Sequence, residues 1–197
     1  MEQGGPAYKP LVWVVGDSFV HWTSRVAATT GAGLDLNSIA TVHWMGKRGL
    51  HIADFNDFLH RCWESEQTSP DYIILHVGSN DLGFLPKKAI LEAVKSVLTV
   101  TRALLPQTIM FWSAILPRVF YPGAFRQNKV ERSRRAINRW VSNLMRFASG
   151  GLIPHPQIDW DGNCFIHDGV HLTDVGCAVV IRDFFDAVRT AIHLNHL

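Results

Sequence analysis

Five residues of this chain are of the types that together can attack an acyl group: a serine, a glycine, an asparagine, an aspartate and a histidine. They lie in four short segments, "GDSF" with Ser18, "GKRGL" with Gly49, "GSND" with Asn80, and "DGVH" with Asp168 and His171. A serine hydroxyl becomes a nucleophile when an imidazole takes its proton, and a carboxylate orients that imidazole. Neutral N–H groups stabilise the oxyanion that follows. This chemistry requires a fold that brings all four segments together.

Ser18 comes shortly after an apolar run, Leu11–Val15, that has the pattern of a buried strand. At the carboxyl end of a strand and the start of a helix, the Ser18 N–H and the helix dipole would favour a developing negative charge. The same "GDS" would also suit a strand-to-helix turn in which Asp17 or Ser18 caps the helix. This segment by itself leaves both interpretations open.

Two further segments offer neutral hydrogen-bond donors after predicted strands. Gly46 and Gly49 in "WMGKRGL" could each present an uncovered backbone N–H. We prefer Gly49 because a predicted helix follows it directly. Asn80 offers a side-chain amide, which stabilises an oxyanion without forming a competing ion pair. Ordinary turn glycines, and an asparagine that only makes a turn, are the alternatives.

Asp168 and His171 are three residues apart in "DGVHLTDVG", with Gly169 between them. A turn would bring the carboxylate to the imidazole Nδ1 and leave Nε2 facing outward as a base. The chain has ten histidines, so a surface aspartate beside a chance histidine is the alternative. The complete set of nucleophile, base, orienting acid and oxyanion donors favours the catalytic interpretation over four separate coincidences.

Alternating strand and helix patterns predict the scaffold that would position these segments. Short apolar runs predict strands at Leu11–Val15, Ser38–Trp44, Asp71–Val77 and Thr108–Ile115. Amphipathic patterns predict helices at Phe19–Thr30, Ile52–Glu64, Lys87–Leu105, Lys129–Phe147 and Thr173–His193. This alternation predicts one α/β domain over residues 1–197, with a mainly parallel sheet covered on both faces. Ligands bind such sheets beyond the carboxyl ends of the strands.

The composition is that of a globular protein, with 47% apolar and 18% charged residues. A net charge of +2 is too small to indicate nucleic acid as a ligand. The start, "MEQGGPAYKP", lacks a secretory pattern, and the apolar runs are shorter than the ~20 residues of a membrane-spanning helix. Cys62, Cys164 and Cys177 are odd in number and widely spaced, which predicts no disulfide framework and a reduced, cytoplasmic location.

With these four segments, the chain resembles the SGNH hydrolases, the GDSL-type esterase and lipase superfamily, from Val12 to about Phe185. The resemblance implies a flavodoxin-like three-layer α/β/α sandwich. It also implies a catalytic triad of Ser18, Asp168 and His171, an oxyanion hole of Ser18, Gly49 and Asn80, and no metal or cofactor. Phe19 replaces the usual leucine of "GDSL". The sequence lacks the G-x-S-x-G elbow of the α/β-hydrolases, which argues against that fold.

Two narrower resemblances suggest the kind of ester. "AILPR" (Ala114–Arg118) is similar to the platelet-activating-factor acetylhydrolase branch. "WSAILPR" and "IPHPQI" resemble the esterase domain in first-open-reading-frame proteins of vertebrate non-LTR retrotransposons. Both imply hydrolysis of short-chain, acetyl-type carboxylic esters on a small-molecule or lipid substrate. The aromatic residues of "FWSAILPRVFYPGAF" leave contact with an acyl chain or a lipid surface open, although Phe111 and Trp112 fit a strand core better.

The competing hypothesis is a binding or scaffold module that contacts nucleic acid or protein within a larger, retroelement-derived parent. Its support is the basic segment "RQNKVERSRRAINRW" (Arg126–Trp140), which could contact phosphates. A solvated helix face is the simpler interpretation of that segment. Phosphodiester hydrolysis is a third option, and it is weaker because it usually requires a metal or more basic residues.

Overall fold

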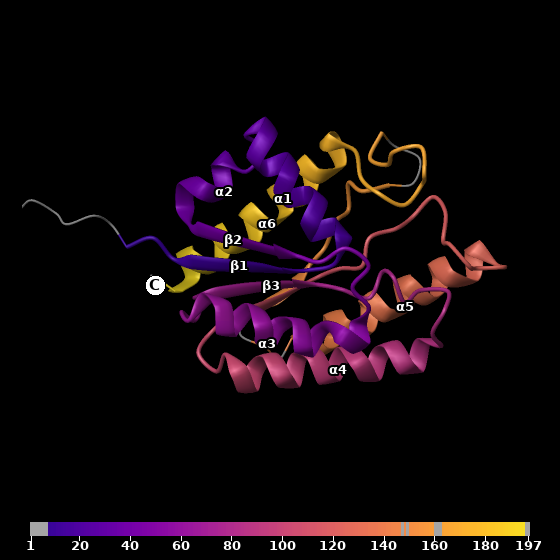
Figure 1. The fold of residues 1–197 in the computed structure, drawn as a ribbon, viewed down its shortest axis with the longest axis horizontal. Coiled ribbons are helices and arrows are strands. Elements are labelled where there is room, and N and C mark those ends of the chain that lie inside the picture. The colour runs from indigo at the N-terminus through magenta and orange to yellow at the C-terminus, as the bar shows by residue number, and fades with distance from the viewer. Residues whose placement is uncertain (1–7, 147, 149, 160–162, 196–197) are drawn as a thin grey trace, which may run out of the picture.

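The computed structural model describes residues 8–146, 148, 150–159 and 163–195. Its centre is a five-stranded sheet in the order β2-β1-β3-β4-β5. The neighbouring strands β2, β1 and β3 are labelled in Figure 1. Every neighbouring pair of strands is parallel. The strands are β1 (Leu11–Gly16), β2 (Thr41–Gly46), β3 (Tyr72–His76), β4 (Ile109–Ser113) and β5 (Gly151–Ile153). Parallel neighbours bring the carboxyl ends of these strands to one edge of the sheet.

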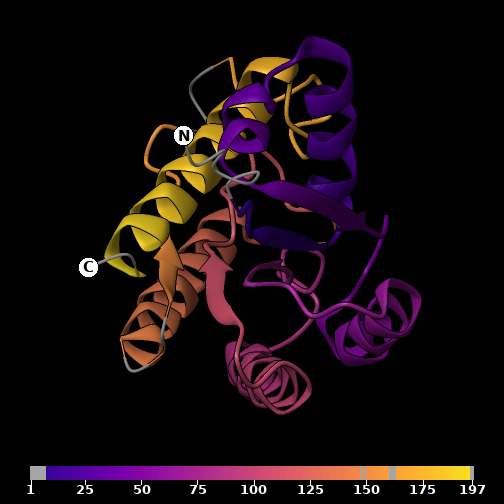
Figure 2. The ribbon, with the colours of Figure 1, turned by 90° about the vertical axis from the view of Figure 1, so that its left-hand side faces the viewer.

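Helices cover both faces of this sheet, so that the fold has three layers (Figures 1 and 2). One face carries α1 (Ser18–Thr30), α2 (Leu34–Ile39) and α6 (Asp174–Asn195). The other carries the short 3₁₀ helix η1 (Ile52–Asp54), α3 (Phe55–Glu66), α4 (Lys87–Leu104) and α5 (Gln127–Met145). The predicted α/β/α sandwich with a parallel sheet is confirmed.

The side chains of β1 show why the sheet separates two cores. Val12 and Val14 point into the core beneath α1, α2 and α6, whereas Trp13 and Val15 point into the core beneath α3, α4 and α5. All four are fully buried. Successive side chains of a strand face opposite sides, so a strand covered on both sides is apolar throughout.

The predicted elements differ from the observed ones mainly at β2 and β5. The strand expected from Ser38 begins at Thr41, because Leu34–Ile39 form α2 and bury Leu36 in the core. The three-residue strand β5 was not predicted, since so short a run carries no period. The helix expected at Lys129–Phe147 begins at Gln127 and ends at Met145. Phe147 lies outside the described residues, as do residues 1–7, which belong to the segment in which no secretory pattern was found.

Within the described part of the chain, no helix has both the length and the apolar character needed to cross a membrane. Cys62, Cys164 and Cys177 are buried thiols, each unpaired.

Candidate active site

Residues from four separate segments line one cavity at the carboxyl edge of the sheet. The cavity has a volume of about 1020 Å³ and its lining includes Ser18, Gly49, Asn80 and His171. We call it the Ser18 cavity. Ser18 follows β1, Gly49 follows β2, Asn80 follows β3, and His171 comes from the segment before α6. The structure thus brings these predicted site residues together.

Asp17 fixes the position of Ser18 at the first residue of α1. One carboxylate oxygen of Asp17 accepts a hydrogen bond from the Phe19 N–H at 3.0 Å, which caps the helix. The other accepts from the Ser79 hydroxyl at 2.5 Å. The Asp17 N–H donates to the carbonyl of His76 on β3. Asp17 is therefore the residue that caps α1, and the hydroxyl of the neighbouring Ser18 is not needed for capping.

Asp17 is fully buried, and this changes its acidity. Burial raises the pKa of Asp17 to about 6, against the opposing hydrogen bonds from Ser79 and Phe19. Taking a carboxylate out of water disfavours its charged form, so the shift has the expected sign. Asp17 therefore supports the turn that carries Ser18. The sequence had identified Asp17 only as one of two candidates for the helix cap.

The Asp168 carboxylate holds His171 at Nδ1. The distance from His171 Nδ1 to Asp168 Oδ2 is 2.7 Å. The other oxygen, Oδ1, accepts from the backbone N–H groups of Val170 and His171 at 2.8 and 2.9 Å. Burial acts to raise the pKa of Asp168, but the hydrogen bonds from His171 and Val170 together outweigh it and the net pKa is lowered. The carboxylate is therefore charged and fixed, and Nε2 is the ring nitrogen left for a base.

His171 also contacts α1 on its other side. Its ring lies edge-to-face with Trp22, with 6.4 Å between the centroids. Among the described residues, the structure records no hydrogen bond between the Ser18 hydroxyl and His171, although both line the Ser18 cavity. Catalytic hydrogen bonds are often loose in the absence of substrate, so this geometry is compatible with a nucleophile and its base.

Gly46 and Gly49 have different surroundings. A Cβ at Gly46 would lie 2.2 Å from the backbone nitrogen of His21, so Gly46 allows β2 to pack tightly against α1. A Cβ at Gly49 would meet nothing within 4 Å, and Gly49 has a φ of +68°. Gly49, which lines the Ser18 cavity, is therefore the glycine with an open face toward a ligand.

Hydrogen bonds tie the loop of Asn80 to the loop of Gly49. Asn80 Nδ2 donates to the carbonyl oxygen of Leu50 at 3.0 Å. The buried carboxylate of Asp81 accepts from the Ile52 N–H at 2.9 Å and lies 3.0 Å from His51 Nδ1. Two of the predicted oxyanion donors are therefore held by a common network.

Arg118, which the sequence identified only within a family motif, also lines the Ser18 cavity. It follows β4, and its Nη2 donates to Asn80 Oδ1 at 3.1 Å. Its position beyond the carboxyl end of a strand is the signal that could have singled it out.

A second Ser–His–Asp arrangement lies in the interior. His155 Nε2 lies 2.8 Å from the Ser113 hydroxyl, and His155 Nδ1 lies 2.7 Å from Asp183. His76 Nδ1 lies 2.7 Å from the same hydroxyl. Ser113, His155 and His76 are buried, and none of them lines the Ser18 cavity. Burial lowers the pKa of His76 to about 3, and the electrostatic influence of His155 and Arg118 acts in the same direction.

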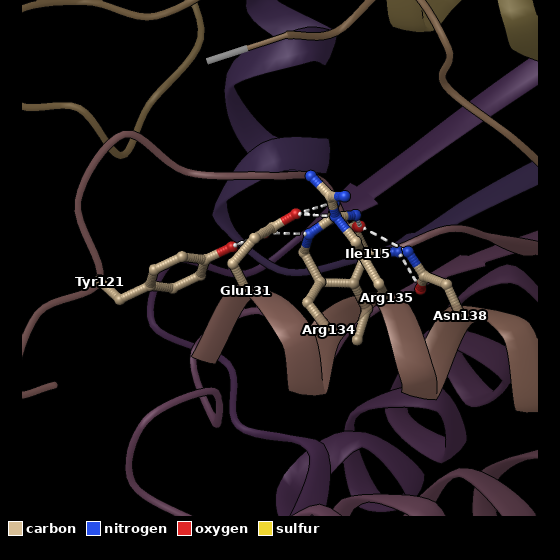
Figure 3. A network of polar contacts seen from close by, with 6 residues as sticks. All are labelled: Ile115, Tyr121, Glu131, Arg134, Arg135 and Asn138. Atoms are coloured by element: carbon tan, nitrogen blue, oxygen red, sulfur yellow. Dashed lines mark hydrogen bonds and ion pairs between the residues drawn. The ribbon is translucent and has the colours of Figure 1, made fainter. Parts of the chain in front are cut away.

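The basic segment on α5 uses part of its charge within the protein. Glu131 binds Arg134 at 2.6 Å and Arg135 at 2.7 Å, and Arg134 also donates to the carbonyl of Ile115 (Figure 3). Burial opposes ionisation of Glu131, but hydrogen bonds from Arg134, Tyr121 and Arg135 lower its pKa to about 2. Two of the arginines that suggested a phosphate-binding face therefore share one carboxylate, which offsets one of their two positive charges.

Comparison with known proteins gives one family. The sequence model of the GDSL-like Lipase/Acylhydrolase family matches residues 13–179. That range contains all four segments that carry the candidate site residues. No curated protein matches the sequence.

Several solved structures share the fold at low sequence identity. A GDSL-like lipase from Bacteroides thetaiotaomicron superposes with a TM-score of 0.68 at 15% identity, covering 94% of this chain and 89% of that one. A family 3 carbohydrate esterase from Clostridium thermocellum gives 0.67 at 15%, covering 95% and 99%. A family 3 carbohydrate esterase from Talaromyces cellulolyticus gives 0.66 at 19%, covering 93% and 98%. The narrower resemblances to acetylhydrolases and retrotransposon proteins stay predictions.

Proposed function

Because the chain belongs to the GDSL-like lipase/acylhydrolase family, we propose that it hydrolyses carboxylic esters through an acyl-serine intermediate. The observation that carries the proposal is the arrangement around the Ser18 cavity. Ser18 and the Asp168-bound His171 line the same cavity as Gly49 and Asn80. These groups supply a nucleophile, a base with its orienting acid, and donors for an oxyanion.

In the proposed reaction, His171 Nε2 takes the proton of the Ser18 hydroxyl as the oxygen attacks the ester carbonyl. The N–H groups of Ser18 and Gly49 and the Asn80 amide stabilise the tetrahedral oxyanion. Collapse of this intermediate breaks the bond to the alcohol, which leaves with the proton from His171. Water then attacks the acyl-serine with His171 again as the base, and the carboxylic acid is released.

We propose short acyl groups, acetyl above all, as the preferred substrates. The narrower resemblances support this, and two of the structural neighbours are carbohydrate esterases by name. The rim of the Ser18 cavity is apolar at Phe84, Leu85 and Pro122, which would suit an uncharged substrate or a lipid. A cavity of about 1020 Å³ has room for more than an acetyl ester, so the chain-length profile has to be measured.

Hydrolysis of p-nitrophenyl esters from acetyl to octanoyl tests the proposal. The wild type should hydrolyse them with the highest kcat/KM on short esters, and Ser18→Ala should lose nearly all turnover. Ser65→Ala, which changes an exposed serine on α3, is the matched control and should keep full activity. A folded wild type as inactive as Ser18→Ala on every ester would contradict the proposal.

A further inference from the structure

We propose that Arg118 is a positioning residue of the oxyanion hole, which it serves by holding the Asn80 carboxamide in its active orientation. This inference rests on the proposed function, since it concerns the donor that Asn80 offers to the ester oxyanion. It goes beyond that function by adding a charged residue to the site and giving it a role.

The contacts of Asn80 allow only one orientation of its amide. Arg118 Nη2 lies 3.1 Å from Oδ1, and Asn80 Nδ2 lies 3.0 Å from the carbonyl oxygen of Leu50. A guanidinium has donors only and a carbonyl is only an acceptor, so exchanging Oδ1 and Nδ2 would break both hydrogen bonds. In the observed orientation, the second N–H of Nδ2 is left for a ligand in the Ser18 cavity.

Arg118 is almost fully buried, and part of its guanidinium lacks a hydrogen-bond partner. The residue is only 7% exposed, and its guanidinium lies 5.6 Å from the centre of the Phe19 ring, next to Ser18. Its Nε is buried without a hydrogen-bond partner. Burial lowers the pKa of Arg118, while the charges of Asp17, Asp168 and Asp81 oppose that shift. A donor buried without a partner is costly, and such exceptions call for an explanation.

Both ends of the segment that carries Arg118 are fixed. On one side, the Ile115 N–H donates to Asn138 and its carbonyl accepts from Asn138 and Arg134 on α5 (Figure 3). On the other side, the Tyr121 hydroxyl donates to Glu131. The polar network around Glu131 on α5 therefore has a consequence for the site, because it limits where Arg118 can lie.

The same segment is bonded to the turn that carries the base. The N–H groups of Val119 and Phe120 both donate to the carbonyl of Gly169, at 2.9 and 3.1 Å. Gly169 lies between Asp168 and His171, so the residues that follow Arg118 are bonded to the turn that carries the base. The side chain of Arg118 is bonded to Asn80. A positive charge behind the Asn80 carbonyl also polarises its N–H toward an oxyanion.

A double-mutant cycle between Arg118→Met and Asn80→Ala tests the proposal on short esters. Arg118→Met should lower kcat by about 10- to 100-fold, the loss typical when a residue that orients an active group is removed, with little change in KM. In the Asn80→Ala background, the same substitution should cost less than about threefold, because two residues that act through one contact are not additive. Equal losses in both backgrounds, or a change confined to KM, would overturn the proposal.

A second measurement does not depend on activity. The side-chain amide signals of Asn80, observed by NMR, should shift and broaden in Arg118→Met, because the amide is then free to rotate. They should stay unchanged in Arg135→Met, which removes an exposed arginine from the same network. If they stay unchanged in Arg118→Met as well, the proposal is wrong, whether or not the protein is an esterase. If Arg118→Met does not fold, Arg118→Gln takes its place in both experiments, since its polar group carries no charge and ends two bonds short of the position of Arg118 Nη2.

Discussion

The Ser113 hydroxyl lies 2.8 Å from His155 Nε2, so the protein builds a serine–histidine contact in its core as well as placing Ser18 and His171 on a cavity. Asp183 accepts a hydrogen bond from His155 Nδ1 at 2.7 Å. The Ser113 hydroxyl also lies 2.7 Å from His76 Nδ1, so it joins the two histidines. Ser113 is fully buried, which separates this arrangement from one that could meet a substrate.

A phosphonate ester that labels activated serines should therefore distinguish the two serines. Mass spectrometry of the labelled protein should find the adduct on the peptide with Ser18 and none on the peptide with Ser113. Ser113→Ala should leave labelling intact but lower the free energy of unfolding by about 2 kcal/mol, because it leaves two buried histidine nitrogens without a partner. Denaturation in urea measures that loss. An adduct on Ser113 in the folded protein would show that burial does not protect it.

Asp17 should make the stability of the protein depend on pH. Its pKa is about 6 in the folded protein against an ordinary value of 3.8, so the folded state holds a proton that the unfolded state has lost. The stabilisation that protonated Asp17 gives the folded protein is therefore fully present below about pH 4, and it is lost as the pH rises through about 6. A shift of about two units corresponds to about 3 kcal/mol.

The substitution Asp17→Asn should remove this dependence. The introduced carboxamide keeps an oxygen for the Phe19 N–H and has nothing to ionise. In urea unfolding from pH 4 to pH 8, the free energy of unfolding of Asp17→Asn should increase relative to that of the wild type as the pH rises. Asp57→Asn, which removes an exposed carboxylate from α3, is the control. A constant difference between Asp17→Asn and wild type across this range would contradict the predicted shift.

Gly46 and Gly49 should respond differently to alanine. At Gly46 the new Cβ would lie 2.2 Å from a backbone atom of α1, so Gly46→Ala should fold poorly or unfold at a much lower temperature. At Gly49 there is space, and the cost should be about 1–2 kcal/mol for an alanine at positive φ. Soluble yield and thermal unfolding compare the two variants. Equal destabilisation would mean that the contact of Gly46 with α1 is relieved by movement of the helix.

For Gly49→Ala, kcat on short esters should fall more than its modest loss of stability explains, because the new Cβ would occupy open space beside the backbone N–H that is the proposed oxyanion donor. If Gly49→Ala keeps full activity, the substrate does not approach this face of Gly49.

The sequence predicted the layers of the fold because the signals for them are local. Apolar runs such as that of β1 and amphipathic patterns such as that of α4 are visible within one element, and they sufficed for a parallel sheet covered by helices. The start of β2 was wrong, since Leu36 and Ile39 suit a helix or a strand equally in so short a segment. Periodicity does not distinguish the two there.

The site shows the same division. Ser18, Asn80 and the Asp168–His171 pair come in short motifs, so their residue types and spacing alone predict a site. The role proposed for Arg118 depends on Asn80, which lies 38 positions away in the chain, and on a network anchored in α5. The chain of His76, Ser113, His155 and Asp183 likewise joins β3, β4, the segment after β5, and α6. No local pattern carries such contacts.

Hydrogen bonds join the loops around the Ser18 cavity to one another, which bears on how the selectivity of the site could change. Gly169 accepts from the loop after β4, and Leu50 accepts from Asn80. Phe84 and Leu85, by contrast, have side chains that are 62% and 41% exposed on the rim. Selectivity is therefore open to redesign by replacing these two side chains, whereas altered loop lengths would break the links between loops. Substrate selectivity in this fold can therefore change more easily through side chains on the cavity rim than through changes in the loops that surround the cavity.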